Sequence, residues 1–434
     1  MFILKNLVSP VQGFMRILWL KTEVLHPVDK GGKIRTYNML KELKREHHVT
    51  YLTLDDGTAS ADDKRNATEY CHELICIPHA RREKFTPGFY VELFLNLVSS
   101  HAYAIKKYES RAMRREIVER DRQGTFDLLV CDFLAPAANI PADLTTPAVL
   151  FQHNVEAMIW KRHYEVQTNP VKKAYLYGQW QKMRRFEREM CRRFDSVIAV
   201  SADDREQMKQ EYGAESVFDV PTGVDVEFFR PSGKMKPVPN SLVFTGSMDW
   251  LPNDDAIRYF TREIMPLIKS KVPDVTLTVV GRNPAPALVD LSKEDKSLII
   301  TGRVDDVRPY MENAAAYIVP LRIGGGTRLK IFEAMAMEKA VVSTTVGAEG
   351  LPLQNGVELL LADEPASFAD AVVRVLTDHA YADELGQRAA TVVRENFGWR
   401  QVTEQFMSIC SSMRTVQSSS FSLLSPKHSL KAEL

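Results

Sequence analysis

Residues 315–343 of this 434-residue chain read AAYIVPLRIGGGTRLKIFEAMAMEKAVVS. The stretch opens with an apolar run, passes through three consecutive glycines at 324–326, continues with apolar residues at helical spacing and ends in a second apolar run. This order predicts a strand, a glycine loop, a helix over about residues 328–338 and another strand. Such a unit is the building block of a doubly wound sheet of parallel strands.

The same alternation of short apolar runs and helical segments extends over most of the chain. The runs are rich in Val, Ile and Leu and alternate only weakly, which is typical of strands covered on both faces. The strands expected in the first half are Arg16–Leu20, Val49–Leu54, Glu73–Ile77, Phe126–Cys131, Ala148–Phe151 and Ser196–Val200. Those expected in the second half are Leu242–Thr245, Thr276–Val280, Leu298–Thr301, Ala315–Pro320 and Ala340–Thr344.

A change of composition separates two copies of this pattern. Residues 226–240 are expected to form a linker or hinge, because residues 230–240 hold three prolines and almost no apolar bulk. We therefore expect an α/β protein with two Rossmann-like domains. The expected segments are an extension over 1–14, the first domain over 15–225, the second over 241–398, a helix over 399–413 that packs back on the first domain, and a disordered tail over 414–434.

Composition excludes several classes of protein. Lys+Arg and Asp+Glu both total 56, whereas a nucleic-acid-binding protein usually has a basic surplus, so no nucleic-acid partner is expected. The five cysteines form no CxxC pair, which argues against a zinc ribbon or a disulfide framework and fits a reducing compartment. No uncharged apolar run reaches 18 residues, so the sequence predicts no transmembrane helix. We expect a soluble, cytoplasmic protein.

Residues 81–115 are locally basic, with eight Lys/Arg against three Glu. The basic ends of this stretch enclose the apolar segments Phe89–Val91 and Leu93–Val98. Two interpretations stay open. The stretch is either an amphipathic helix that packs on the core with a solvated basic side, or a surface for a membrane or a lipid-linked acceptor. The second interpretation would place the protein peripherally on the inner face of the membrane.

The glycine loop has the features of an anion site. Glycines let an anion approach their amides closely, and the free N–H groups of a helix that begins near Thr327 favour a phosphate. Arg328 and Lys330 add positive charge, and Glu333 stands where a carboxylate could accept hydrogen bonds from two ribose hydroxyls. The stretch predicts a nucleotide-diphosphate site, although the same residues also suit a plain helix entry followed by a solvated Glu.

This stretch resembles a motif of glycosyltransferase family 4, in the subgroup that reads Gly-x-Gly-Thr-Arg-Leu-Lys-x-x-Glu-Ala-Met-Ala. Other segments resemble the family's motifs in the expected order. They are Pro27-Val-Asp-Lys-Gly-Gly-Lys-Ile-Arg35, Gln152-His-Asn-Val-Glu156, Val200-Ser201, Val220-Pro-Thr-Gly-Val-Asp225, Phe244-Thr-Gly-Ser-Met-Asp-Trp-Leu-Pro-Asn253 and Thr301-Gly-Arg-Val304. The resemblance covers roughly residues 15–413. It implies the GT-B fold, in which two Rossmann-like domains face each other across a cleft, and sugar transfer with retention at the anomeric carbon.

The resemblance also implies roles for individual residues. His153 would hydrogen-bond the donor sugar, while Arg328 and Lys330 would stabilise the departing diphosphate. The residues expected to contact the donor are Gly31, Gly32, Ser247, Gly302, Arg303, Val304, Gly325, Gly326, Thr327, Leu329 and Glu333. Those expected to bind the acceptor are Arg35, Asp132 and Glu156. Without the resemblance, His153 could equally be a histidine whose hydrogen bonds are made by the neighbouring backbone.

Two departures from the family pattern affect these roles. Gly325 stands where the family often has a Glu that contacts the transferred sugar, so the resemblance does not specify the sugar. Many members also carry an Arg, and a Lys six residues later, in the first loop of the donor domain. Here those positions are Ser247 and Asn253, and we expect Arg328 and Lys330 to supply the missing charge.

The sequence favours a retaining, metal-independent glycosyltransferase of the hexosyltransferase type. Its donor would be a UDP- or GDP-linked sugar and its acceptor a glycan or a lipid-linked molecule in polysaccharide or glycoconjugate biosynthesis. No cofactor is expected, and no Asp-x-Asp or His-Glu-x-x-His pattern indicates a metal site. A sugar-nucleotide epimerase of the same fold and an inactive nucleotide-sugar-binding relative remain alternatives. A nicotinamide dehydrogenase is disfavoured because Leu329 replaces the third glycine of the dinucleotide fingerprint.

Overall fold

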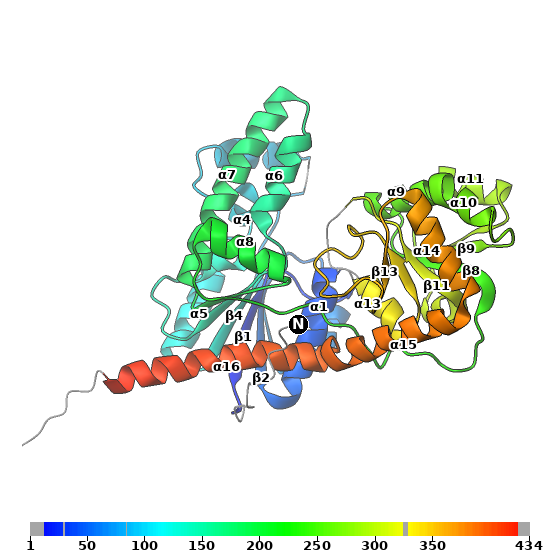
Figure 1. Ribbon diagram of the computed structural model, residues 1–434. Helices are drawn as coiled ribbons and strands as arrows, with labels where there is room; N and C mark the ends of the chain where they lie inside the picture. Colours follow the sequence, from blue (N-terminus) through cyan, green and yellow to red (C-terminus); the bar gives the residue numbers. More distant parts are fainter. Residues whose placement is uncertain (1–12, 29–30, 84, 324–328, 424–434) are drawn as a thin grey trace, which may run out of the picture. The chain divides into compact units, whose positions relative to one another are not determined.

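The computed structural model of the chain describes residues 13–28, 31–83, 85–323 and 329–423, with side chains up to residue 413. It divides into two compact units. Unit 1 is the described part of Met1–Val220 together with that of Thr403–Leu434, and unit 2 is the described part of Pro221–Val402. Each unit is built on a sheet of parallel strands with helices around it (Figure 1). The prediction of an α/β protein with two doubly wound sheets is confirmed.

The sheet of unit 1 has the strand order β3-β2-β1-β4-β5-β6-β7. The strands are β1 (Arg16–Lys21), β2 (His48–Asp55), β3 (Glu73–Pro78), β4 (Leu128–Asp132), β5 (Ala148–Phe151), β6 (Ser196–Ala199) and β7 (Val217–Asp219). Leu18 of β1 pairs in parallel with Thr50 on one side and with Leu129 on the other. Because the order reverses between β1 and β4, the carboxyl ends of these two strands form the topological switch point, where α/β sheets bind ligands.

The sheet of unit 2 repeats this design in the order β10-β9-β8-β11-β12-β13. The strands are β8 (Val238–Thr245), β9 (Thr276–Val280), β10 (Leu298–Gly302), β11 (Ala314–Val319), β12 (Val341–Ser343) and β13 (Leu360–Leu361). Here the order reverses between β8 and β11, and the hydroxyls of Thr245 and Tyr317 join these two strands at 2.5 Å. The second switch point therefore lies at the carboxyl ends of β8 and β11.

The helices of unit 1 connect its strands. They are α1 (Gly31–Glu46), α2 (Ala61–Arg65), α3 (Pro87–Asn96), α4 (Tyr103–Lys106), α5 (Arg111–Arg122), α6 (Glu156–Val166), α7 (Pro170–Arg193) and α8 (Ala202–Tyr212), with 3-10 turns at Asn66–Glu69 and Ala135–Asn139. Five of them begin at side-chain caps that each accept the backbone N–H three residues later, and the capping residues are Ser60, Thr86, Ser110, Asn169 and Ser201. Helices α6 and α7 form an antiparallel hairpin (Figure 1).

The helices of unit 2 surround the second sheet. They are α9 (Leu251–Tyr259), a π turn (Phe260–Ile264), α10 (Met265–Lys269), α11 (Pro286–Glu294), α12 (Arg308–Glu312), α13 (Leu329–Ala336), α14 (Pro365–Thr377) and α15 (His379–Asn396). Helix α16 (Trp399–Leu423) begins in unit 2 and continues into unit 1. Among the described residues, no helix combines the length and the apolar character that crossing a bilayer requires.

Each unit has its own apolar core. In unit 1, Leu18, Leu52 and Leu129 lie fully buried on neighbouring strands of the sheet. Phe406 of α16 packs on Trp19 of β1 and Phe151 of β5, with ring centroids 5.8 and 5.4 Å apart. The C-terminal helix therefore contributes to the core of unit 1.

The structure corrects three boundaries. The units divide after Val220, before the expected linker at 226–240, because the N–H of Val224 donates to the carbonyl of Phe397 at 2.8 Å and thereby joins this segment to unit 2. Strand β8 begins at Val238, inside that linker. Helix α16 continues to Leu423, beyond the predicted end of this helix at residue 413, and the predicted disorder of the tail stays a prediction. Residues 424–434 and 1–12 lie outside the described residues.

The structure also bears on the basic stretch at 81–115. Its last part, at the start of α5, buries Met113 against the core, as expected for an amphipathic helix. Helix α3 does the opposite, since Tyr90, Val91, Phe94 and Leu95 are each more than half exposed. The interpretation as a helix that packs its apolar side on the core is therefore wrong for α3.

Candidate active site

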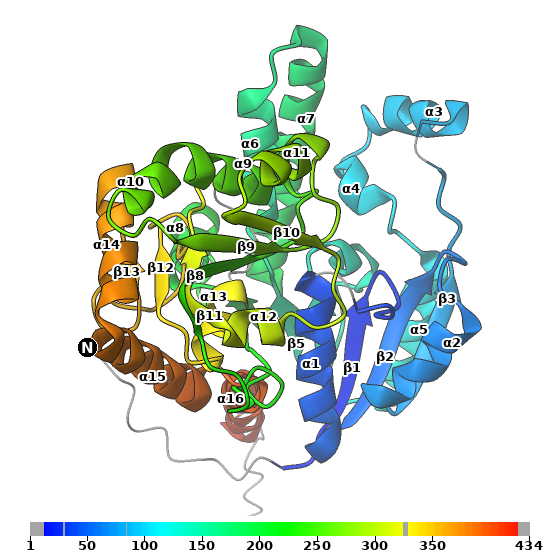
Figure 2. The ribbon, with the colours of Figure 1, turned by 90° about the vertical axis from the view of Figure 1, so that its right-hand side faces the viewer.

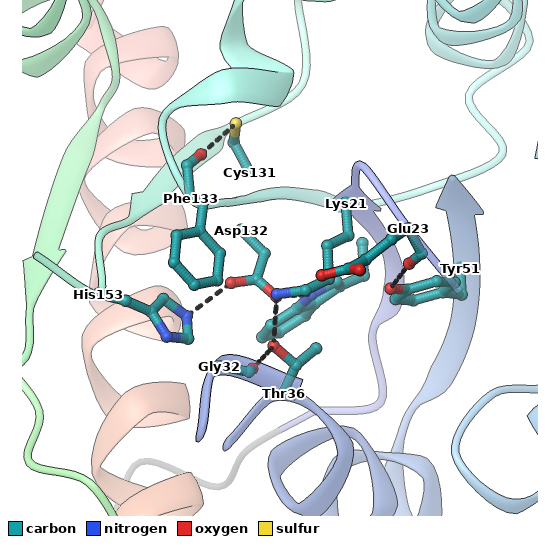
Figure 3. A network of polar contacts seen from close by, with 10 residues as sticks. Lys21, Glu23, Gly32, Thr36, Tyr51, Cys131, Asp132, Phe133 and His153 are labelled. Atoms are coloured by element: carbon teal, nitrogen blue, oxygen red, sulfur yellow. Dashed lines mark hydrogen bonds and ion pairs between the residues drawn. The ribbon is translucent and has the colours of Figure 1, made fainter. Parts of the chain in front are cut away.

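A buried carboxylate occupies the switch point of unit 1 (Figure 3). Asp132 is the last residue of β4 and is fully buried. Its Oδ2 accepts hydrogen bonds from Thr36 Oγ1 at 2.6 Å, Lys21 Nζ at 2.8 Å and Trp19 Nε1 at 3.0 Å. Its Oδ1 lies 2.7 Å from His153 Nε2. Side chains from β1, α1 and the loop after β5 thus converge on one carboxyl group.

This carboxyl group is held in its ionised form. Burial alone would raise the pKa of Asp132, but the charge of Lys21, the neighbouring His153 and the hydrogen bonds from both outweigh burial and bring the pKa far below its ordinary value. Lys21 is itself buried, which lowers its pKa, while Asp132 opposes that change. The two groups form a buried ion pair, the arrangement in which buried charges are tolerated.

The state of His153 follows from that of Asp132. Burial lowers the pKa of His153 to about 4, although Asp132 acts in the opposite direction, so the ring is neutral at pH 7. An ionised carboxylate only accepts hydrogen bonds, and Nε2 therefore carries the proton of the neutral ring. Nδ1 keeps its lone pair and has no hydrogen-bond partner among the described residues. The arrangement presents Nδ1 as an acceptor for a hydroxyl group.

Phe133 fixes the plane of the His153 ring. The two rings are stacked with centroids 3.9 Å apart, and Lys21 Nζ lies 4.2 Å from the Phe133 centroid (Figure 3). Phe133 adopts a φ of 70°, which is uncommon for a residue with a side chain. Gly32 makes room for this ring, because a Cβ there would lie 2.8 Å from Phe133 Cζ. Gly32 thus has a packing role, whereas the donor contacts expected of Gly31 and Gly32 stay predictions.

The structure corrects two of the expected acceptor residues. Arg35 is fully buried, donates from Nη2 to the carbonyl of Val220 at 2.6 Å and packs on the ring of Phe151. Burial lowers its pKa to about 9. Asp132 is also fully buried and its oxygens are occupied by protein donors, so both residues act inside the protein. Glu156 is half-buried at the start of α6, burial raises its pKa to about 7, and its acceptor role stays a prediction.

A cation lies at the switch point of unit 2. Lys330, the second residue of α13, donates from Nζ to Asn253 Oδ1 at 2.8 Å, and its Nζ lies 4.1 Å from the ring centroid of Phe244. Asn253 Nδ2 in turn donates to the carbonyl of Ser247 at 2.8 Å, which holds the loop after β8. A Cβ on Gly246 would lie 2.8 Å from Lys330 Nζ, so the glycine leaves space for the ammonium group.

A second cation, which the sequence motifs do not indicate, reaches the same loop. Arg282 follows β9, and its Nε donates to Ser247 Oγ at 2.8 Å. The resemblance to the family implies Arg and Lys where this chain has Ser247 and Asn253. In the structure, both residues accept a hydrogen bond from a cation on another element, which for Asn253 is Lys330. Charged residues directly after apolar strands are the only sequence signal for Arg282 and for Lys21. Arg328, expected to supply charge here, lies outside the described residues together with Gly325, Gly326 and Thr327.

Glu333 lies about one turn after Lys330 on α13. It is half-buried, and burial raises its pKa to about 7 although Lys330 acts to lower it. Burial also raises the pKa of Tyr317 on β11, and the nearby Glu333 adds to that rise. The switch point thus combines a cation with a carboxyl group that titrates near neutral pH, a combination common in functional sites.

The remaining predicted donor residues lie elsewhere in unit 2. Gly302 ends β10, two strands from β8, and has a φ of 70°, which favours glycine. Arg303 is exposed, Val304 packs on the core of unit 2, and Leu329 is the first residue of α13. Their donor contacts stay predictions. Among the described residues, no group of three or more His, Cys, Asp or Glu side chains is placed to hold a metal ion.

Comparison with protein families covers both units. The family model described as Glycosyltransferase Family 4 matches residues 30–228, and that described as Glycosyl transferases group 1 matches residues 239–378. The chain is a GT-B glycosyltransferase. The family expected from the sequence motifs is thereby confirmed, and the protein is a transferase of class EC 2.4.

Similar proteins span much of the GT-B chain. A 44.6 kDa protein in the cps region of Klebsiella pneumoniae is 21% identical over 89% of this chain and 97% of that protein. The phosphatidyl-myo-inositol mannosyltransferase of Mycobacterium tuberculosis is 27% identical over 51% of this chain and 61% of that enzyme. The crystal structure of Anabaena HepE in complex with UDP and glucose shares the fold, with a TM-score of 0.61 and 15% identity over 92% of this chain and 100% of that chain.

Proposed function

We propose that this glycosyltransferase moves a sugar from a nucleotide-diphosphate sugar to a glycan or lipid-linked acceptor, with retention at the anomeric carbon and without a metal ion. The observation that carries the proposal is the placement of Lys330 at the switch point of unit 2, fixed by Asn253 and about one turn from Glu333. In this proposal Lys330 binds the diphosphate and Glu333 binds the ribose, so each of the two charged side chains has a ligand group as its partner. UDP and glucose in the HepE structure support a UDP-linked donor, and GDP is the alternative nucleotide.

Stabilisation of the departing diphosphate falls to the cations of unit 2. Lys330 Nζ is fixed in place by Asn253, and Arg282 is held by Ser247. Cations that are already oriented stabilise charge as it develops on the leaving group, and this effect is usually the largest in transfer reactions. Arg328 would add to this set.

We assign His153 to the transferred sugar. Its Nδ1 accepts a hydrogen bond from a sugar hydroxyl, which fills the unused acceptor position described above. With a pKa of about 4 the ring is a poor general base at neutral pH. The proton of the attacking acceptor hydroxyl therefore passes to the departing phosphate oxygen, and Asp132 acts as a positioning residue for His153.

The acceptor and the location of the enzyme form a second part of the proposal. The mycobacterial relative is named as a mannosyltransferase of phosphatidyl-myo-inositol, and the Klebsiella protein is named for the cps region. Both names support a role in polysaccharide or glycolipid assembly. The exposed apolar residues of α3 within the basic stretch 81–115 support peripheral contact with the inner face of a membrane.

Calorimetric titration with UDP, GDP and the matching nucleosides, each in EDTA, tests the donor site. We expect Lys330→Met to weaken diphosphate binding at least tenfold and to leave nucleoside binding unchanged, whereas Glu333→Ala weakens both. Lys293→Met is the control, because Lys293 is exposed on α11 and pairs only with Asp290 among the described residues. Equal losses for diphosphate and nucleoside in Lys330→Met would contradict the diphosphate role. NMR of the product then reports whether the anomeric configuration is retained.

A further inference from the structure

Unit 1 contains a cavity of about 470 Å³ that the proposed chemistry does not use. Its walls come from the segment after β3, from α3 and from α4, and they include Phe89, Leu95 and Tyr103. Figure 2 shows α3 set apart from strands β1 to β3 of the same unit. The residues that line the cavity do not include Asp132 or His153.

One side of this cavity is an apolar helix that lacks an apolar partner on its outer face. Polar contacts of the buried Asn96 fix the end of helix α3. Its Oδ1 accepts a hydrogen bond from Gln179 Nε2 at 2.9 Å, and its backbone carbonyl accepts one from Lys182 Nζ at 2.6 Å. The exposed apolar residues of α3 and the turn after it are Tyr90, Val91, Phe94, Leu95, Leu97 and Val98. Clustered apolar exposure of this kind marks interaction sites.

The other side of the cavity is cationic. The lining residues with charge are Arg81, Arg82, Lys106 and Lys107 against Glu92. Arg82 pairs with Glu92 at 2.8 Å, but both side chains are well exposed, and exposed ion pairs contribute little energy. Lys107 has no carboxylate partner among the described residues, and its Nζ lies 4.8 Å from the ring centroid of Tyr108. Arg81 also pairs with Asp56 at 3.4 Å, and Lys106 pairs with Glu109. The net positive charge that an entering anion meets therefore comes chiefly from Lys107.

Arg81 connects the cationic side to the loop beside the Asp132 network. Its Nη2 donates to the carbonyl of Thr22 at 2.7 Å, and Thr22 follows Lys21, the residue that pairs with Asp132. The Nε of Arg81 is buried without a hydrogen-bond partner among the described residues. An anionic group held by Arg81 and Lys107 would thus lie on the side of the cavity nearest the end of β1.

We propose that this cavity binds an amphiphile in which an apolar chain carries a phosphate or diphosphate, and that this molecule is the lipid-linked acceptor. The phosphate lies against Arg81 and Lys107, and the chain runs along Phe89 and Leu95 of α3. The pairing of a cationic side with an apolar side selects such a molecule over a neutral lipid or a free sugar phosphate. Its role as acceptor rests on the proposed function, whereas its binding does not.

Titration calorimetry on the full chain tests the binding, with monomeric farnesyl diphosphate as the probe. Farnesol and inorganic diphosphate are the comparison ligands. We expect farnesyl diphosphate to bind at least tenfold more tightly than either one. Lys107→Gln should weaken farnesyl diphosphate tenfold without affecting farnesol, and Leu95→Ser should weaken both. The matched controls are Lys172→Gln and Val171→Ser, two exposed positions at the start of α7, and both should bind as the wild type does.

Three results would overturn this proposal. The first is equal affinity for farnesyl diphosphate and farnesol, and the second is binding to vesicles of anionic phospholipid without binding of the monomer. The third is loss of farnesyl diphosphate binding in Lys330→Met, which would place the probe in the donor site of unit 2. Titration of UDP in the Lys107→Gln variant separates the two proposals. If Lys107→Gln loses farnesyl diphosphate binding but still binds UDP, the result supports the cavity. If the wild type does not bind UDP, the result contradicts the proposed donor site and leaves the cavity proposal unaffected.

Discussion

The chemistry of His153 depends on the carboxylate beside it, and Asp132→Asn tests that dependence. The amide keeps the shape of the carboxyl group but leaves Lys21 buried without its counter-charge, and it no longer selects the Nε2 proton of His153. Breaking a buried ion pair in this way costs about 3–5 kcal/mol of unfolding free energy. We also expect the transfer rate to fall by about 10²-fold, the usual cost of a misplaced group.

Chemical denaturation and steady-state kinetics measure these two effects. Asp127→Asn is the control, since Asp127 forms a partly exposed pair with Arg16 at 2.9 Å near the start of β1. We expect this variant to lose little stability and to keep its transfer rate. A stable Asp132→Asn protein with wild-type activity would show that the ion pair does not set the state of His153.

Glu333 predicts how donor affinity changes with pH. Burial raises its pKa from 4.5 to about 7. In the proposed site, ribose hydroxyls would donate hydrogen bonds to the ionised form. Affinity for the nucleotide sugar should therefore rise between about pH 6 and pH 8 as the carboxyl ionises. Because the folded pKa is the higher one, the contribution of Glu333 to stability is present below pH 4.5 and is lost as the pH rises through about 7.

Titration with UDP-glucose across this pH range checks the dependence, because its diphosphate is esterified at both ends and has no group that titrates near neutrality. The Glu333→Gln variant should bind with an affinity that does not change over the same range. A wild-type affinity that is constant with pH, or that falls as the pH rises, would contradict the ribose role.

The residues of the site differ in how visible they are in the sequence. His153, Lys330 and Glu333 lie within motifs whose spacing reveals them. Lys21 and Arg282 are single charged residues after apolar strands, and only the strand order of each sheet brings them to a switch point. Arg35 shows the reverse case, because its position in a glycine-rich motif indicated a ligand contact while its side chain is buried in the core.

Among the elements, α1 depends on a glycine for its fit against the site. A Cβ on Gly32 would lie 2.8 Å from Phe133 Cζ, so Gly32→Ala must displace the ring that stacks on His153. Overpacking of this kind costs about 1–3 kcal/mol. Gly178→Ala on α7 is the matched control, because nothing lies within 4 Å of its Cβ position. There the substitution should stabilise by about 0.5–1 kcal/mol.

Thermal unfolding of the two variants gives opposite shifts if Gly32 is required for packing. A stabilising shift in both variants would mean that Phe133 adjusts without cost. The circular dichroism of the folded state should be unchanged in both variants, since each substitution lies in a helix that the rest of its unit supports.

The elements that the sequence predicts well are those with a strong apolar pattern. The long buried strands such as β1, β2 and β9 match their predicted ranges closely. Strands β7 and β13 were missed because two or three residues are too few to show a periodicity, and their pairing with β6 and β12 defines them. The sequence showed that helix α3 is apolar, but not that its apolar residues are exposed. The periodicity of a helix does not reveal whether a core lies beside its apolar face.

For the whole molecule, the repeated alternation of strands and helices was enough to predict two doubly wound sheets. The division between the units was not predictable from composition, since it depends on a contact between distant segments. The proline-rich residues 230–240 resemble a linker, yet Val224 already belongs to unit 2 through its hydrogen bond to Phe397. Long-range pairing of this kind leaves no local signal in the chain.

Helix α16 leads to a prediction about the stability of each unit. It begins in unit 2, but Phe406 is fully buried against Trp19 and Phe151 of unit 1. Phe406→Ala should therefore remove about 3–5 kcal/mol from unit 1, the usual cost of deleting a buried aromatic ring. Unit 2 should keep its stability, because the side chain lies in the core of the other unit.

Hydrogen exchange resolves the two units, which a single melting curve does not, because a two-unit chain need not unfold in one step. We expect faster exchange in β1 and β5 and unchanged exchange in β8 and β11. Gln405→Ala is the control. Gln405 precedes Phe406 in the chain, its side chain is exposed, and it donates a surface hydrogen bond to the carbonyl of Asp219. Equal acceleration in both sheets would mean that the units unfold together, and Phe406 would then stabilise the chain as one cooperative structure.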